Sequence, residues 1–221
     1  MSIIGSNILA GASGADTGFD PTTPIGTAIE GGFFAGFISH TADGVATHAL
    51  IVAPAATGAS GSGYTLTTNY RWQQSDSLTN ATSLFDGASN TALMTNSFSA
   101  NFCTALTIGG YTDWYLPARD ELEIAYFNLK PTTGSNNTSY GINDYSVPKR
   151  TSNYTSGNPG QTSVSAFQSG NSEAFQGGQY HWSSTEITSS VAPRLFFGNG
   201  FVNNVGKRFS TPVRAFRKVA L

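Results

Sequence analysis

Apolar residues along this chain gather in short runs separated by small and polar residues, as in β-rich proteins. Two such runs, residues 32–39 and 48–53, flank the dipeptide Asp43-Gly44. Runs of this length joined through Asp-Gly predict a β-hairpin, and Pro54 would end its second strand. A further short strand is predicted at residues 70–72, where aromatic residues flank an arginine.

The apolar spacing changes to a helical period in two places. Leucine, methionine and phenylalanine recur at helical spacing within residues 91–107, which predicts a helix from about Thr95. Residues 118–129 predict a second helix, because Pro117 precedes it, acidic residues occupy its first turn and its apolar residues share one face.

The C-terminal part of the chain returns to a strand pattern. Strands are predicted at 180–185, 192–198, 200–205 and 211–219. The Phe197-Gly198-Asn199-Gly200-Phe201 segment predicts a tight hairpin. Before these strands, residues 131–178 are poor in aliphatic residues and rich in Asn, Ser, Thr and Gly, which indicates a long polar loop insertion of the functional kind.

The N-terminal residues 1–26 are small and carry two prolines, so we predict an extended arm that is ordered by docking on a partner, such as a sister subunit. The start of the chain has no basic segment followed by a long apolar run, and no stretch is long enough to span a membrane. We therefore expect a protein made in a cytoplasm, without a signal peptide and without membrane insertion.

Composition narrows the class of protein. Only 11% of the 221 residues are charged and 12% are aromatic, a profile typical of β-rich extracellular or virion proteins and not of disordered chains. The single cysteine, Cys103, cannot form an internal disulfide, and we expect it to be buried in a helix.

Three phrases of the sequence carry a family resemblance. They are Gly-Tyr-Thr-Asp-Trp-Tyr-Leu-Pro-Ala-Arg-Asp-Glu-Leu at 110–122, Tyr-His-Trp-Ser-Ser-Thr-Glu at 180–186 and Val-Arg-Ala-Phe-Arg at 213–217. Together they resemble the domain of unknown function found at the C-terminus of a Legionella collagen-like adhesin and in many bacteriophage tail-fibre proteins. The segment 6–14 is also similar to the start of some phage structural proteins.

The resemblance implies an α+β, C-type-lectin-like fold over residues 27–221. Two helices would flank small twisted antiparallel sheets with long loops, after the extended arm. It implies adhesins or receptor-binding proteins, often homotrimers, some of which vary surface residues near the C-terminus. Asn199, Asn203 and Asn204 lie where such positions would fall.

Candidate chemistry is sparse. The three histidines are scattered without metal-ligand spacing, the loops lack the carboxylates of sugar-binding calcium sites, and no nucleophile or phosphate-loop motif is present. We therefore expect no catalytic residues, no metal and no cofactor. The net charge of −2 and the absence of a recognition motif also argue against nucleic acid as a partner.

Several residues allow two interpretations. Trp114 and Trp182 could stack on a sugar, but their place inside the resemblance phrases favours core aromatics. The acidic residues of 113–123 could perform acid–base chemistry, but Asp120 and Glu121 suit a helix start, and Glu121 could fix a buried hydrogen bond. Charge offers a clearer signal, because the last 35 residues hold six basic residues and no acidic one.

Within that basic region, we expect Arg214 and Arg217 to pair with Asp113, Glu121 or Glu123, and Arg194, Lys207 and Arg208 to be exposed. Guanidinium groups could then bind carboxylated or sulfated glycans. The predicted ligand surface mixes aromatic and amide side chains, as adaptable binding loops do. Its residues are Tyr180, Arg194, Phe196, Asn199, Phe201, Asn203, Asn204 and Lys207.

The sequence thus predicts a bacteriophage tail-fibre or receptor-binding protein that recognises a glycan or protein on the host surface. The alternative is a capsid-decoration or tail/baseplate protein that uses the same fold for contacts between subunits. In that case the 131–178 and 194–208 segments would be buried between subunits, whereas in a receptor binder they would point outward.

Overall fold

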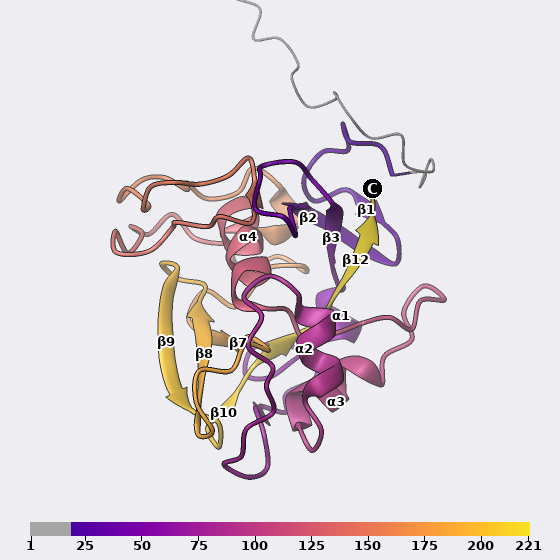
Figure 1. Ribbon diagram of the computed structural model, residues 1–221. Helices are drawn as coiled ribbons and strands as arrows, with labels where there is room; N and C mark the ends of the chain where they lie inside the picture. The colour runs from indigo at the N-terminus through magenta and orange to yellow at the C-terminus, as the bar shows by residue number, and fades with distance from the viewer. Residues whose placement is uncertain (1–18) are drawn as a thin grey trace, which may run out of the picture.

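The predicted hairpin forms the centre of the largest sheet (Figure 1). The computed structural model describes residues 19–221. In it, β2 (Gly32–Ile38) and β3 (His48–Val52) pair antiparallel. The C-terminal strand β12 (Phe216–Ala220) pairs with the other edge of β3, so both ends of the described chain meet in one sheet. Two short strands, β1 (Ala28–Ile29) and β6 (Ser146–Val147), pair with β2.

This sheet buries both of its faces, which explains why residues 49–53 are apolar without alternation. Ala49 and Ile51 belong to one hydrophobic cluster, which also contains Trp72, Trp114 and Trp182. Leu50 and Val52 belong to the other, which is built around the long helix and several phenylalanines. Both tryptophans of the resemblance phrases are at most 1% exposed, so their interpretation as core residues is confirmed.

The second predicted helix is present as α4 (Arg119–Leu129), which packs on β2. The first is present as α3 (Phe98–Thr104), which begins three residues after Thr95. A separate short helix, α2 (Gly87–Leu93), precedes it, and Asn96 between the two takes a positive φ of 63°. The Ser97 side chain accepts the Ala100 N–H, the ordinary role of an N-cap serine. Cys103 is buried in α3, as expected.

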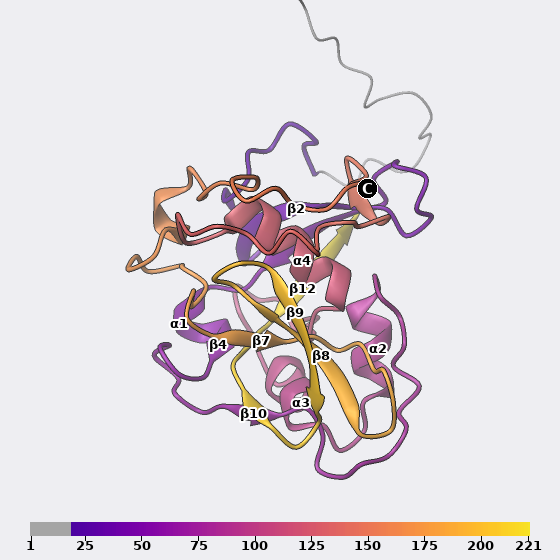
Figure 2. The ribbon, with the colours of Figure 1, turned by 90° about the vertical axis from the view of Figure 1, so that its left-hand side faces the viewer.

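The predicted C-terminal strands divide into shorter ones. The strands β7 (Tyr180–Trp182), β8 (Val191–Phe196) and β9 (Phe201–Gly206) form a three-stranded antiparallel sheet (Figure 2). The predicted strand 211–219 is interrupted, giving β10 (Ser210–Thr211), β11 (Val213–Arg214) and β12. Strand β10 pairs with β5 (Tyr70–Arg71), and β11 pairs with β4 (Ala59–Ser60), which follows the short helix α1 (Ala55–Gly58).

The polar segment 131–178 is more integrated than its composition indicates. It contains only β6 and a 3₁₀ helix at Ser165–Phe167, yet Tyr154, Phe167 and Phe175 are buried in the cluster around α4. These few aromatic residues fix a long loop to the domain, because each buries a large apolar area.

Most of the predicted arm 1–26 lies outside the described residues, as does the 6–14 resemblance. Its last part, residues 19–26, packs on the domain through Phe19, whose ring centroid lies 5.2 Å from that of Phe34. The expected α+β class is confirmed in its coarse form: residues 19–221 combine four α-helices with several small antiparallel sheets.

Candidate functional site

The β7–β8–β9 sheet brings several of the predicted ligand residues onto one face. Tyr180 lies opposite Phe196, Phe196 lies opposite Phe201, and Arg194 lies opposite Asn203. Directly paired residues, and residues two apart on a strand, share a face of a sheet. Tyr180, Arg194, Phe196, Phe201 and Asn203 therefore form one surface, called the outer face below. All five are half-buried, so parts of their side chains remain open to solvent.

Arg194 is the charged centre of the outer face. Its guanidinium carbon lies 4.2 Å from the ring centroid of Tyr180, whose ring lies 5.0 Å from that of Phe196. Nη1 donates to Thr211 Oγ1 at 3.2 Å, while the buried Nε has no hydrogen-bond partner in the described part of the chain. Among residues 19–221 no carboxylate forms an ion pair with Arg194, and burial lowers its pKa from the usual value.

Phe209 extends the outer face toward a groove. It is 59% exposed, and its ring centroid lies 6.0 Å from the Arg194 guanidinium carbon. It also lines a groove of about 370 Å³ together with Asp76, Arg208 and the ends of β8 and β9. Phe209 is not among the ligand residues predicted from the sequence. A large aromatic residue in the polar turn Lys207-Arg208-Phe209-Ser210 was the available signal.

Two predicted residues lie off this surface. Asn199 is half-buried in the β8–β9 turn, where its Oδ1 accepts the Phe201 N–H and its carbonyl accepts the Asn137 N–H. Asn204 is exposed and pairs with Pro193, which by strand alternation places it on the opposite side of the sheet from Asn203. The asparagines therefore do not form one cluster.

The expected exposure of Lys207 is wrong. Its side chain is 0% exposed and forms an ion pair with Glu186, whose side chain is 1% exposed. Nζ also donates to Ser77 O and Gln73 Oε1, and it lies 4.4 Å from the ring centroid of Trp72. Every donor of the ammonium group is used, so Lys207 stabilises the fold and presents no charge to a ligand.

The other basic residues follow the expectation in part. Arg217 pairs with Asp113, as predicted, and also with Glu30. Arg214 is buried and pairs with Glu173, a partner the sequence analysis did not consider. Arg208 is exposed and pairs with Asp76. Lys218 pairs with Asp86, so Arg194 is the one of the six C-terminal cations without a carboxylate partner among residues 19–221.

Glu121 occupies the start of α4 as expected, and it does fix buried hydrogen bonds. Its carboxylate accepts the backbone N–H groups of Ala118 and Gly87 and the Tyr115 hydroxyl, at 2.7, 3.1 and 2.8 Å. Burial raises its pKa to about 8, against the opposing effect of these donors. A side chain at position 87 would meet the Glu121 carboxylate, which explains the glycine there. This carboxylate joins α2 to α4.

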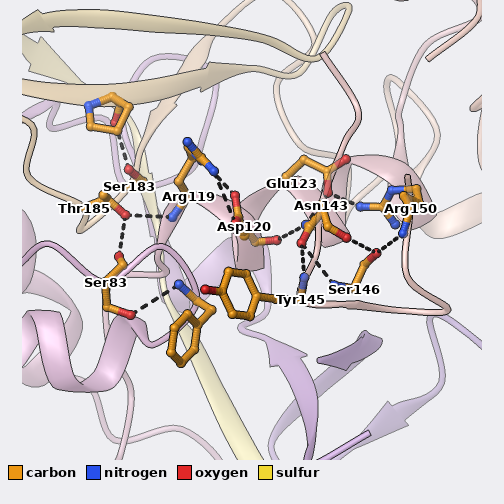
Figure 3. Close-up of polar contacts among 12 residues, drawn as sticks. Ser83, Arg119, Asp120, Glu123, Asn143, Tyr145, Ser146, Arg150, Ser183 and Thr185 are labelled. Carbon is orange, nitrogen blue, oxygen red and sulfur yellow. Dashed lines mark hydrogen bonds and ion pairs between the residues drawn. The ribbon is translucent and has the colours of Figure 1, made fainter. Parts of the chain in front are cut away.

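A second network ties the polar segment to α4 (Figure 3). Glu123 pairs with Arg150 and accepts a hydrogen bond from the Tyr154 hydroxyl. It accepts another from Asn143 Nδ2 at 2.5 Å. Asn143 also donates to the carbonyl of Asp120. Burial raises the pKa of Glu123, and Arg150 opposes that rise. The network explains how a loop with few aliphatic residues keeps a fixed course.

Within residues 19–221, no group of three or more His, Cys, Asp or Glu side chains is placed to hold a metal ion. None of the helices in that range is long and apolar enough to cross a membrane. Comparison with protein-family models and with curated proteins finds no match to this chain. The outer face, with tilted aromatic rings beside a partly dehydrated guanidinium, is suited to binding a ligand ring beside an anionic group.

Proposed function

We propose that this chain is a non-catalytic attachment protein of a bacteriophage virion, of the tail-fibre type. It recognises a glycan or protein on the host surface through the outer face. The observation that carries the proposal is Arg194, a half-buried residue whose guanidinium lies over the Tyr180 ring and has no carboxylate partner among residues 19–221. A cation that the fold leaves unpaired is available to a ligand, whereas a paired one is not.

The arrangement of elements supports a C-type-lectin-like fold. The first and last strands share one sheet, the helices lie between them in sequence, and a separate three-stranded sheet precedes the C-terminal strand. We propose that the chain assembles as a homotrimer, with residues 1–26 docking on other virion proteins. Three copies of a weakly binding face on one particle would give strong attachment through multivalency.

The test compares binding of the purified protein to a bacterial glycan array and to a panel of bacterial cells. The variants Arg194→Met and Phe196→Ala change the outer face, and Asn204→Ala changes the other side of the same sheet. Binding by the wild type that falls about tenfold or more in the first two variants and persists in Asn204→Ala supports the proposal.

The alternative function, a structural contact between subunits, predicts a different result. In that case the wild type binds neither glycans nor cells, and Arg194→Met shifts the oligomeric state measured by analytical ultracentrifugation. Binding that is equal in all variants would refute the assignment of the outer face.

A further inference from the structure

A second hollow lies on the other side of β9, at the first turns of α4. It has a volume of about 230 Å³ and is lined by Arg119, Asp120 and Glu123 of α4, by the 139–142 loop, and by Asn153 and Val202. Asp120 and Glu123 are three positions apart on the helix, which places them on one face. This hollow is called the α4 cleft below. None of the residues of the outer face lines it.

The base of the α4 cleft carries a carboxylate with spare hydrogen-bonding capacity. Asp120 is 3% exposed, and its carboxylate accepts only from Arg119, with Nε at 2.7 Å and Nη2 at 3.3 Å (Figure 3). An ionised carboxylate offers about four acceptor sites, so about two remain on Asp120. Glu123, by contrast, already accepts from Arg150, Tyr154 and Asn143, which leaves about one such site. Asp120 is therefore the acceptor that a bound molecule can use.

The rim adds donors and an aromatic wall. The Ser139 hydroxyl and the Asn153 amide are exposed and make no side-chain hydrogen bond within the described chain. Tyr140 is fixed by its hydroxyl, which donates to Val202 O at 3.0 Å, and by an edge contact with Phe201. The Arg119 side chain is 35% exposed, so part of its guanidinium also faces solvent.

Charge and size limit what the α4 cleft can hold. Asp120 and Glu123 are each balanced by an arginine, so the cleft has no excess charge that would select a polyanion or a polycation. Its volume is below the about 300–1,000 Å³ of pockets for drug-sized ligands. A carboxylate, a guanidinium, a hydroxyl and an amide beside a tyrosine ring instead match a small molecule that carries several hydroxyl groups on an apolar frame.

We propose that the α4 cleft binds a single neutral hexose ring. A pair of adjacent sugar hydroxyls would donate to Asp120 and accept from Arg119. The Asn153 amide would bind a further hydroxyl, and the Tyr140 ring would cover the apolar side of the sugar. This site is separate from the outer face and does not depend on the function proposed for it.

The test is a titration of the isotope-labelled protein with the methyl glycosides of glucose, galactose and mannose, followed by backbone amide NMR shifts. At least one glycoside should give saturable shifts confined to residues 119–123, 139–142, 153 and 202, with a Kd of roughly 1–10 mM for so small a ligand. Asp120→Asn should weaken binding about tenfold, because it replaces a charged acceptor.

A variant at the rim of the cleft keeps the test decisive if Asp120→Asn, at a buried position, fails to fold. Asn153→Ala removes an exposed side chain and should weaken binding several-fold without changing the melting temperature. Asn204→Ala, outside the cleft, and Arg194→Met, on the outer face, should leave the Kd unchanged. Absence of saturable shifts with all three glycosides, or a Kd that neither cleft variant alters, would overturn the proposal.

Discussion

Replacing Lys207 by methionine should destabilise the protein strongly, although a lysine in a basic C-terminal hairpin would ordinarily tolerate such a change. The substitution keeps most of the length of the side chain and removes its ammonium group. Glu186, whose side chain is 1% exposed, then loses its only basic partner among residues 19–221. It retains the backbone N–H groups of Thr79 and Asn80, at 2.9 Å each.

The magnitude follows from burial. Removing one member of a buried ion pair leaves an uncompensated charge and costs about 3–5 kcal/mol. Burial alone would raise the pKa of Glu186, and the hydrogen bond from Lys207 brings it below the usual value. At neutral pH the variant must therefore bury a carboxylate without its cation or protonate it, and either choice lowers the free energy of unfolding.

Urea unfolding followed by tryptophan fluorescence measures the effect, because Trp72 lies against the Lys207 ammonium group. With a denaturant slope near 3 kcal/mol/M, the midpoint should fall by about 1 M or more. Arg208→Met is the matched control, since the neighbouring Arg208–Asp76 pair is exposed and should contribute less than about 1 kcal/mol. Equal midpoints for the two variants would refute the argument from burial.

Three further predictions concern other parts of the fold. Burial, and then Arg214, lower the pKa of His181 to about 3, below the usual 6.5. The unfolded chain therefore binds a proton that the folded chain does not, and stability should fall by up to about 1.4 kcal/mol per pH unit from pH 6.5 toward 3. The urea midpoint should change less steeply with pH in His181→Gln than in the wild type. An equal pH dependence in both proteins would contradict its assignment to His181. Gly200→Ala should cost about 1–3 kcal/mol, because φ is +76° and the new Cβ would lie 2.5 Å from a tyrosine ring carbon. Gly157→Ala, which meets open space, should be nearly neutral when both variants are unfolded in urea. Arg150→Met should cost about 3 kcal/mol and increase amide exchange across residues 131–160, because it strips the cation from a buried glutamate. Lys149→Met, at an exposed ion pair, should change neither the free energy of unfolding nor the amide exchange.

Sequence patterns were sufficient to predict an element where residues close together in the sequence determine its structure. Helix α4 follows from the proline before it, the acidic first turn and the apolar face, and the structure begins it at Arg119. The hairpin of β2 and β3 follows from its apolar runs and the Asp-Gly turn. In the 91–107 region the apolar spacing predicted the helix from about Thr95, and the Ser97 cap sets its start at Phe98. The preceding helix α2 was not predicted.

Long-range pairing could not be predicted in the same way. Lys207 is buried because it pairs with Glu186, and Arg214 is buried beside Glu173. Neither pairing follows from the spacing of these residues in the sequence. Strand alternation is a local rule: it groups Arg194 with Phe196 on one face, and it separates Asn203 from Asn204, which the sequence analysis had grouped together. The α4 cleft was not foreseen, because its walls come from a helix, a loop and a strand far apart in the sequence.

Binding of wild type and Arg194→Met to the same bacterial glycan array tests the central claim most directly. The account predicts that the wild type binds glycans carrying a carboxylate or sulfate group beside a sugar ring. Arg194→Met should lose that binding while its urea midpoint stays close to that of the wild type, since no ion pair within residues 19–221 is broken. Equal binding by the wild type and by Arg194→Met would contradict the proposal that this guanidinium binds the host-surface ligand.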